Sequence, residues 1–264
     1  MLLENKVAVI HGGGGAIGSA IAKAFAHEGA KVYLSGRTRA HLDAVVNPIA
    51  AAGGFAQAAQ VDALDQEAVN TYLGEVVNEA GRVDISFMAA GIPPEGTQGT
   101  ALLDLSTENF MKPIDAYAKS FFITSTAAAR HMVKQRSGVI LVHTPEVSRL
   151  GIAFTGGMGP SWAAMEAHTR NLSAELAQFG VRALTLRSTG LPETPAFDLV
   201  SSLHARALGI SKAQFQAFTA NMNHIKRPTT LHEVAEAAVF AASDRASSMT
   251  AATMNLTGGM VVDW

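Results

Sequence analysis

Two ionisable side chains flank a proline at the point where an apolar run ends. His143 closes the run 139–143, and Glu146 lies three residues later, beyond Pro145. An imidazole and a carboxylate at this spacing could work as a general acid and base, because histidine titrates near neutral pH. Parallel sheets bind ligands at the carboxyl ends of their strands, where this pair would lie. The alternatives are a buried histidine bonded to backbone and a solvated loop carboxylate.

A glycine-rich turn near the start of the chain has the spacing of a phosphate-binding loop. The apolar run 7–10 is followed by His-Gly-Gly-Gly-Gly-Ala-Ile-Gly and then by a helical pattern. In this setting glycines let the backbone approach a pyrophosphate, and the helix directs N–H groups at it. The alternative is a turn that is rich in glycine only for close strand–helix packing. The residues expected to bind a dinucleotide here are Gly12, Gly13, Gly15, Ile17 and Gly18.

The end of the second apolar run bears on the choice of nucleotide. The sequence there is Ser-Gly-Arg-Thr-Arg, and it lacks the carboxylate that binds the ribose hydroxyls of NAD. Arg37 and Arg39 offer guanidinium groups to a 2′-phosphate instead. We therefore predict that NADP(H) is bound in preference to NAD(H). In the alternative, both arginines are solvated residues at the start of the next helix.

These groups need a scaffold that brings strand ends together. Short apolar or β-branched runs alternate with longer segments of helical periodicity. This alternation predicts an α/β fold of the Rossmann type, doubly wound, with a seven-stranded parallel sheet and helices on both faces. The expected strands are 7–10, 31–35, 55–61, 84–89, 139–143, 181–186 and 254–256. The expected helices are 17–27, 41–51, 66–79, 108–135, 161–179 and 232–242.

Residues 195–228 depart from this alternation. Their apolar spacing predicts one or two short helices inserted before the last helix–strand unit. Such an insertion beside the strand ends usually covers the ligand crevice, so we predict a lid over a small-molecule substrate. No linker, repeat or composition break divides residues 1–264, which indicates a single domain.

Composition excludes several classes of function. The 20 basic and 22 acidic residues are scattered rather than gathered into a basic stripe, so nucleic acid is not an expected partner. The absence of cysteine removes disulfides and thiolate chemistry, and the histidine spacing indicates no metal site. No run reaches ~18 apolar residues, and no leader pattern precedes the first strand. We expect a cytoplasmic protein without a membrane partner.

Several segments, in the correct order, resemble the short-chain dehydrogenase/reductase family. Besides the glycine turn, Asp62 resembles the aspartate that binds the adenine amino group, and Gly91 ends a Met-Ala-Ala-Gly segment similar to the family's Asn-Asn-Ala-Gly. Leu191 and Thr194 lie in Thr-Gly-Leu-Pro-Glu-Thr, which is similar to the segment that holds the nicotinamide amide. The resemblance spans about residues 5–263 and implies the family's fold more strongly than its activity.

The resemblance also locates the positions of the family's catalytic residues. In the family a tyrosine transfers the substrate proton, a lysine four residues later lowers its pKa, a serine polarises the carbonyl, and an asparagine holds a water relay. Counting from the flanking patterns, these positions hold Met158, Trp162, Pro145 and Tyr117. We therefore predict a divergent member with an apolar wall at this site, and ordinary carbonyl reduction by the family mechanism is not expected.

Three groups are candidates for the missing proton transfer. Tyr117 is the first, because its position faces the nicotinamide crevice in the family, and His143 and Glu146 are the others. Lys119 lies two residues from Tyr117, so it projects from a different face of the helix and does not lower the phenol pKa.

Three hypotheses follow for function. The first is an atypical NADP(H)-dependent oxidoreductase that reduces an activated double bond, an imine or a carbonyl. The second is a nucleotide-binding homologue without turnover, and the third is a non-redox isomerase, lyase or cyclase. The resemblance also implies a homodimer or homotetramer formed through helices 108–135 and 161–179, with small alanine faces at 127–129 and 163–164.

Overall fold

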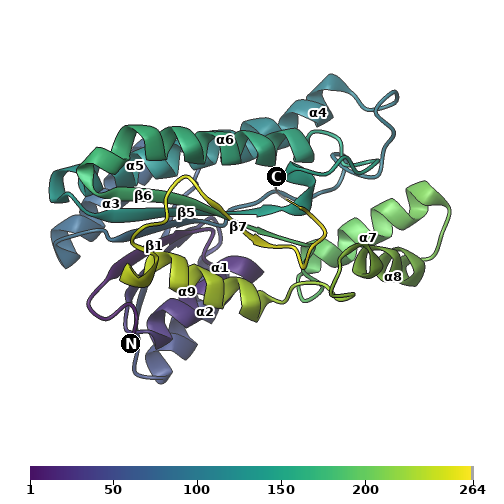
Figure 1. The fold of residues 1–264 in the computed structure, drawn as a ribbon. Helices are drawn as coiled ribbons and strands as arrows, with labels where there is room; N and C mark the ends of the chain where they lie inside the picture. Colours follow the sequence, from purple (N-terminus) through teal and green to yellow (C-terminus); the bar gives the residue numbers. More distant parts are fainter. Residues whose placement is uncertain (263–264) are drawn as a thin grey trace.

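The computed structural model describes residues 1–262 and is built around one seven-stranded sheet. All neighbouring strands are parallel, in the order β3-β2-β1-β4-β5-β6-β7 (Figure 1), which confirms the predicted fold class. The order reverses between β1 and β4, where doubly wound sheets bind ligands. The strands are β1 (Val7–His11), β2 (Lys31–Gly36), β3 (Phe55–Gln60), β4 (Ile85–Met88), β5 (Gly138–Pro145), β6 (Val181–Ser188) and β7 (Thr253–Leu256).

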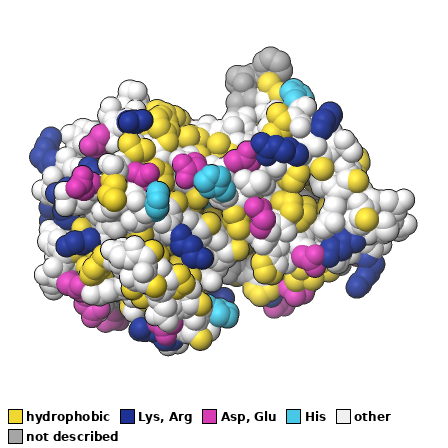
Figure 2. Space-filling view, turned by 90° about the horizontal axis from the view of Figure 1, so that it is seen from below, with side chains coloured by type: hydrophobic (Ala, Val, Ile, Leu, Met, Phe, Trp, Pro, Cys, Tyr) yellow, Lys and Arg dark blue, Asp and Glu magenta, His cyan; other side chains and the backbone are white. Residues whose placement is uncertain are grey.

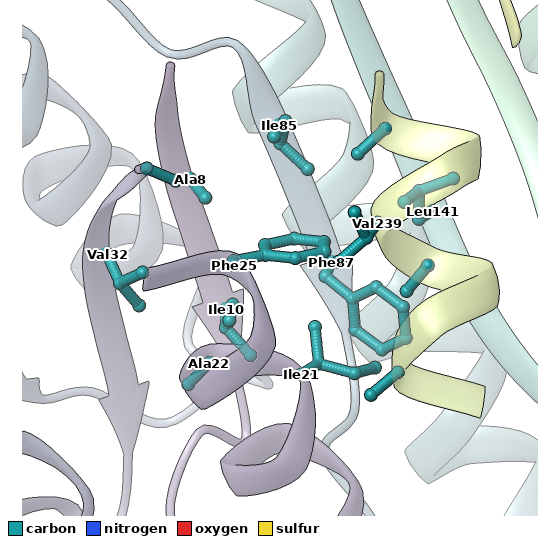
Figure 3. Packing of buried hydrophobic residues seen from close by; sticks show 14 of the residues in the cluster. Ala8, Ile10, Ile21, Ala22, Phe25, Val32, Ile85, Phe87, Leu141 and Val239 are labelled. Atoms are coloured by element: carbon teal, nitrogen blue, oxygen red, sulfur yellow. The ribbon is translucent and has the colours of Figure 1, made fainter. Parts of the chain in front are cut away.

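Helices cover both faces of the sheet and close two hydrophobic cores. Figure 1 shows α1 (Ala16–His27), α2 (Arg39–Ala51) and α9 (Leu231–Ala242) on one side. The opposite side carries α3 (Gln66–Ala80), α5 (Lys119–Gln135) and α6 (Met158–Leu176). On the first face Phe25 and Phe87 lie close to Ile21 and Val239 (Figure 3). Successive strand residues point to opposite faces, so Phe87 enters one core and Met88 the other.

The predicted helix 108–135 is interrupted. It consists of α4 (Thr107–Pro113), a π-helical turn at Ile114–Ala118, and α5. Pro113 stands at the junction and has no N–H to continue the α-helical ladder. π turns occur as single insertions of this kind and are frequent at functional sites. Tyr117 lies within the turn.

Helix α6 begins three residues earlier than predicted, at Met158. Pro160 lies in its first turn, where backbone N–H groups have no partner within the helix and a proline is tolerated. Met158 and Trp162 are therefore one turn apart on the same face of α6. The helix ends at Leu176 and passes into a 3-10 turn, Ala177–Phe179.

The segment between β6 and α9 contains two helices, as predicted. These are α7 (Pro195–Leu208) and α8 (Lys212–Met222), and they lie beyond the end of the sheet (Figure 1). Thr194 caps α7, Pro195 occupies its first turn, and Gly209 follows it with φ +68°. A capping box of Ser211 and Gln214 begins α8.

The surface carries charges of both signs without a basic stripe on the face that Figure 2 shows. Within residues 1–262, no helix is long and apolar enough to cross a membrane. The same residues contain no group of three His, Asp or Glu side chains placed to hold a metal ion.

The alanines expected at a subunit interface are not all at the surface. Ala127, Ala128 and Ala129 are buried against the chain's own sheet, so their small size serves the packing of α5 on the strands. The outward face of α5 carries Phe122 instead, which is 52% exposed and packs against His168 of α6.

Candidate active site

Two adjoining cavities follow the carboxyl ends of the strands. The smaller has a volume of about 220 Å³ and the larger about 540 Å³. They meet at a waist lined by Gly15, Arg37, residues 89–92 and Tyr117. Together they form one elongated crevice that crosses the topological switch point of the sheet.

The glycine turn divides into residues that line the crevice and residues that pack. Gly12 and Gly15 line the smaller cavity, and Ile17 lines the larger. Gly13 and Gly18 line neither of them. Gly13 and Gly18 lie against other parts of the chain, which is the arrangement that the packing alternative expects.

The contacts of added Cβ atoms explain this division. A Cβ on Gly13 would lie 2.8 Å from the side chain of Leu34, and one on Gly18 would lie 2.4 Å from Gly12 O. A Cβ on Gly12 would lie 2.4 Å from Ala90 N, and its φ of +79° already favours glycine. A Cβ on Gly15 meets only Gly12 O, at 3.4 Å. A side chain added at Gly15 would therefore meet little protein.

Gly15→Ala and Gly12→Ala are expected to separate nucleotide binding from folding. We expect Gly12→Ala to lower the free energy of unfolding by roughly 2–5 kcal/mol, because it adds backbone strain and an overlap with Ala90. Gly15→Ala should cost about 1 kcal/mol or less, since only a helix N-cap preference is lost. It should nevertheless weaken nucleotide binding by at least about tenfold. Urea unfolding and calorimetric titration measure the two effects. Unchanged nucleotide binding in Gly15→Ala would contradict the expectation that Gly15 lies against the nucleotide.

The smaller cavity is bordered by Arg37 and Asp62. Arg37 is exposed at its mouth, and the structure gives it no ion-pair partner within residues 1–262. Arg39, by contrast, donates to Asp43 Oδ1 at 2.8 Å and to Ala58 O at 3.1 Å. Asp62 accepts a hydrogen bond from its own loop, at Leu64 N. Of the two arginines, Arg37 is the one positioned to contact a ligand.

The larger cavity has a mostly apolar wall that includes Pro145, Met158 and Trp162. The Tyr117 ring lies 5.6 Å from the Trp162 ring, with their planes tilted by 60°. The Tyr117 hydroxyl accepts a hydrogen bond from Ile92 N at 3.4 Å. Burial raises the pKa of Tyr117, and this hydrogen bond acts in the opposite direction without outweighing it. The phenol is therefore protonated at neutral pH.

His143 lines the same cavity, and its imidazole is neutral and hydrogen-bonded to Ser188. Its Nε2 lies 2.8 Å from Ser188 Oγ, and that hydroxyl donates its proton to Thr189 O. The histidine nitrogen must then be the donor to Ser188, so Nε2 carries the ring proton. Burial lowers the pKa of His143 to about 4. No hydrogen bond joins His143 to Glu146 in the described part of the chain, although both line this cavity.

Glu146 opens a 3-10 turn, Glu146–Ser148, directly after β5. The residue is partly buried and lines the larger cavity, and its Oε2 is buried without a hydrogen-bond partner. Burial raises the pKa of Glu146 to about 7, although a backbone hydrogen bond acts in the opposite direction. A carboxyl group with this pKa is protonated in about half of the molecules at neutral pH.

Residues from two further segments that resemble the family also border the larger cavity: Gly91 from Met-Ala-Ala-Gly, and Leu191 and Thr194 from the nicotinamide segment. Gly91 lies at the waist, where an added Cβ would come within 3.2 Å of the Tyr117 hydroxyl. Leu191 lines the cavity wall. The Thr194 hydroxyl is occupied: it donates to Leu191 O at 2.8 Å and accepts from Phe197 N at 3.2 Å. Its capping role therefore competes with the ligand contact that the resemblance implies.

The part of the larger cavity's wall that α7 and α8 form was largely missed by sequence reasoning. His204 of α7 bonds Gln98 Oε1 at 3.0 Å, and its ring lies 5.3 Å from that of Phe215 in α8. Burial lowers the pKa of His204, so the imidazole is neutral here. Gln98 and His204 are 106 residues apart, and no local pattern connects them. The only available signal was the apolar spacing of the inserted helices.

A buried ion pair lies behind the cavity wall. Arg187 of β6 donates through Nη2 to Glu166 Oε2 of α6 at 2.8 Å, and both side chains are at most 4% exposed. Glu166 Oε1 also accepts from Thr144 at 2.9 Å and from Ser148 at 2.6 Å. Burial acts to raise the pKa of Glu166, but the bonds from Arg187 and its neighbours outweigh it and lower the pKa. The pair joins α6 to β5, β6 and the turn that carries Glu146.

A model of the family described as enoyl-(acyl carrier protein) reductase matches residues 14–261. The chain belongs to the short-chain dehydrogenase/reductase family. Among its curated relatives is the 3-oxoacyl-(acyl-carrier-protein) reductase FabG of Chlamydia pneumoniae, 29% identical over 258 residues, with 98% of each chain covered. Its relatives in this family include other dehydrogenases and reductases, so the chain is of the short-chain oxidoreductase type.

Solved structures of short-chain dehydrogenases share the fold closely. NAD⁺-bound xylitol dehydrogenase has a TM-score of 0.91 at 22% identity and covers 98% of this chain and 100% of its own. The gluconate 5-dehydrogenase of Burkholderia cenocepacia J2315, in complex with NADP and tartrate, has a TM-score of 0.85 at 23% identity, with 98% and 96% covered. One holds NAD⁺ and the other NADP, so kinship alone does not select the nucleotide.

Proposed function

We propose that this chain is an NADP(H)-dependent oxidoreductase in which Glu146 supplies the substrate proton. The observation that carries the proposal is a buried, unpartnered carboxyl oxygen in the wall of an apolar cavity. This cavity adjoins the smaller one beside the glycine turn. The proposal includes the replacement of the family's catalytic residues, with Tyr117, Pro145, Met158 and Trp162 at their positions.

The residues around the crevice fit a bound nicotinamide nucleotide. Gly15 leaves the backbone bare beside the N-terminus of α1, where a pyrophosphate would be held, and Gly12 lines the same cavity. Asp62 borders the adenine end, and Gly91 keeps the waist open next to Tyr117. The nucleotide would supply or accept a hydride, and the protein's part is to hold it and to move the proton.

Arg37 favours NADP(H). Its guanidinium borders the smaller cavity at the end of β2, the position from which this fold contacts the ribose 2′ substituent. Thr38 lies beside it as the N-cap of α2, with no cap hydrogen bond to its side chain. Together they offer a positive charge and a hydroxyl to a 2′-phosphate, and no carboxylate lies in this segment to repel it.

Among the three candidates for proton transfer, Glu146 has the best-matched acidity. His143 is neutral and commits its Nε2 proton to Ser188, while burial makes the Tyr117 phenol a weaker acid than usual. A general acid works best when its pKa lies near the operating pH. Burial raises the pKa of Glu146 to about 7, and no protein group occupies Oε2.

Arg37→Gln tests the nucleotide assignment. We expect NADPH to bind the variant roughly 10- to 100-fold more weakly, because a charged hydrogen bond to the 2′-phosphate is lost. NADH binding should be unchanged. Arg39→Gln is the matched control, since Arg39 is engaged with Asp43 and Ala58 and should leave both affinities unaltered. Calorimetric titration with NADPH and NADH measures all four values.

The outcomes also separate the competing functions. Wild-type protein that binds neither nucleotide contradicts the proposal. Tight NADPH binding with no NADPH oxidation across imines, enones and carbonyls favours the non-catalytic homologue. Substrate conversion without a change in nicotinamide absorbance favours an isomerase, lyase or cyclase.

Two further features belong to the proposal. Helices α7 and α8 act as a lid, since Phe197, Phe215 and Phe218 form part of the larger cavity's wall. The chain also self-associates through the outer faces of α5 and α6, where Phe122 exposes an aromatic ring.

A further inference from the structure

Glu146 stands out among the polar groups of the larger cavity. Several other polar side chains of the wall bond to protein groups. These bonded side chains include Gln98, His143, Thr155, Thr194, His204 and Thr219. Among the described residues of this wall, only Glu146 has a buried side-chain oxygen without a partner. The buried and unpartnered oxygen that a ligand meets in this wall is therefore acidic.

Among the described residues, Glu146 is the one acidic side chain of the ionisable groups that line the larger cavity, and few charges lie near it. The cavity's ionisable lining groups are Arg37, Tyr117, His143, Glu146 and His204. Burial lowers the pKa of both histidines and raises that of Tyr117, so all three are uncharged near pH 7. Arg37 lies at the waist and borders the smaller cavity as well. An ionised Glu146 would therefore be a nearly isolated anion in an apolar wall, and such a charge needs a cationic partner.

We infer that the substrate of this site is an apolar imine whose nitrogen hydrogen-bonds to Glu146, and that the product is the corresponding amine. The inference rests on the proposed oxidoreductase function and names its substrate class. An aromatic bicyclic imine suits the cavity of about 540 Å³, with Trp162 and Phe215 as apolar and aromatic surfaces on its wall.

The reaction balances with the groups already proposed. The imine carbon receives the hydride that the reduced nicotinamide supplies, and the imine nitrogen receives the proton of the Glu146 carboxyl. The C=N π bond breaks as one C–H and one N–H bond form. Glu146 is left as a carboxylate, which recovers its proton from solvent after the amine departs. NADPH is the reductant and becomes NADP⁺.

The physical preference for nitrogen over oxygen comes from charge. An imine nitrogen is basic enough to take a proton from a carboxylic acid before the hydride arrives, whereas a carbonyl oxygen is not. The amine formed in this step is neutral; it takes a second proton from solvent and is then cationic at neutral pH, because alkylamines such as lysine have pKa values near 10. It therefore neutralises the Glu146 carboxylate inside the cavity. An alcohol product would leave that carboxylate unpaired in an apolar wall.

Binding of a product-like amine tests the inference without turnover. The probes are 1,2,3,4-tetrahydroisoquinoline and isochroman, which have the same shape and differ by NH₂⁺ against a neutral oxygen. At pH 8, with and without NADP⁺, we expect wild-type protein to bind the amine roughly 10- to 100-fold more tightly than the ether. At pH 5.5 the preference should disappear, because Glu146 is protonated there while the amine keeps its charge.

Two variants complete the binding test. Glu146→Gln should show no preference for the amine at either pH. Glu95→Gln is the matched control, because Glu95 is an exposed carboxylate on the loop after β4 that does not line the cavity, and it should behave as wild type. Equal binding of the two probes by wild-type protein, or a preference that survives in Glu146→Gln, overturns the inference.

Turnover separates failure of the inference from failure of the proposed function. NADPH oxidation with 3,4-dihydroisoquinoline at a rate well above that with 1-tetralone supports both. Oxidation with 1-tetralone but not with the imine leaves the oxidoreductase function standing and overturns the imine assignment. A cation-dependent binding preference without NADPH oxidation by any acceptor supports the amine-binding site and overturns the oxidoreductase function.

Discussion

Arg187→Met is expected to lower the free energy of unfolding by roughly 3–5 kcal/mol, which is the usual cost of leaving one charge of a buried pair without its partner. Glu166 would keep its bonds from Thr144 and Ser148 but would lose its positive neighbour in a position that is almost fully buried. The loss should also loosen the turn that carries Glu146, because Ser148 bonds the same carboxylate. Urea unfolding at pH 7 measures the effect.

The double variant Glu166→Leu, Arg187→Met is the control for this change. It removes both charges and should recover much of the lost stability, because apolar pairs often replace buried ion pairs without penalty. Thr144→Val should cost only about 1 kcal/mol, since it removes a single hydrogen bond. An Arg187→Met protein within about 1 kcal/mol of wild type would show that the pair carries little of the stability.

The pH dependence of this pair has a definite sign. Arg187 and its neighbours lower the folded-state pKa of Glu166 against the opposing effect of burial. The stability from the ionised carboxylate is therefore present above the ordinary glutamate pKa and is lost as pH falls through the lowered value. The difference in stability between wild type and Arg187→Met should narrow in acid.

Glu146→Gln is expected to reduce turnover by roughly 10²- to 10⁴-fold, the range that general acid catalysis commonly contributes. The amide keeps the size of the side chain but cannot deliver a proton. Nucleotide affinity should be unchanged, because Glu146 lies on the larger cavity and not on the smaller one. Steady-state rates of NADPH oxidation, together with calorimetric titration of NADPH, measure the two quantities.

The rate profile should report the same carboxyl group. Burial raises the pKa of Glu146 to about 7, and the acid form is the active one in reduction. The rate in wild type should therefore fall as pH rises through about 7, and the residual rate in Glu146→Gln should lack this fall. Tyr117→Phe is the comparison that identifies the donor. If Tyr117→Phe abolishes turnover while Glu146→Gln retains it, the tyrosine is the donor.

Stability supplies a check on Glu146 that does not depend on activity. Its pKa is raised in the folded state, so the stability associated with its protonated form is present below the ordinary glutamate pKa and is lost as pH rises through about 7. Glu146→Gln carries no such charge. Its stability should therefore increase relative to wild type over this range.

The sequence predicted the sheet well, because strand and helix periodicities are local properties. Element ends differ from the prediction by up to three residues, apart from the 108–135 segment, where local pattern saw one helix and the structure has a π turn after Pro113. The spacing of apolar residues does not reveal one extra residue within a helix. The position of Tyr117 nevertheless depends on that extra residue, because the tyrosine lies in the π turn.

The candidate site was predictable only where a residue's neighbours in sequence are also its neighbours in space. The glycine turn and Arg37 fall in this class. The partner of His143 was not predictable, since Ser188 comes from the adjacent strand, 45 residues later. The lack of a partner at Glu146 Oε2 is likewise a property of the assembled cavity. The pKa shift that makes Glu146 a candidate follows from burial, which sequence spacing does not reveal.

The π turn at Ile114–Ala118 has a consequence for how this site can vary. A π turn is an α-helix that has accommodated one additional residue without disturbing the helical segments on either side. Removing one residue there would restore a continuous α-helix and leave α4 and α5 in their present orientations, because the π turn is what absorbs the extra residue. The wide turn would be lost, and with it the position from which the phenol of Tyr117 reaches the waist. One insertion or deletion, rather than any substitution, is thus the smallest genetic step that adds or withdraws a side chain at this position.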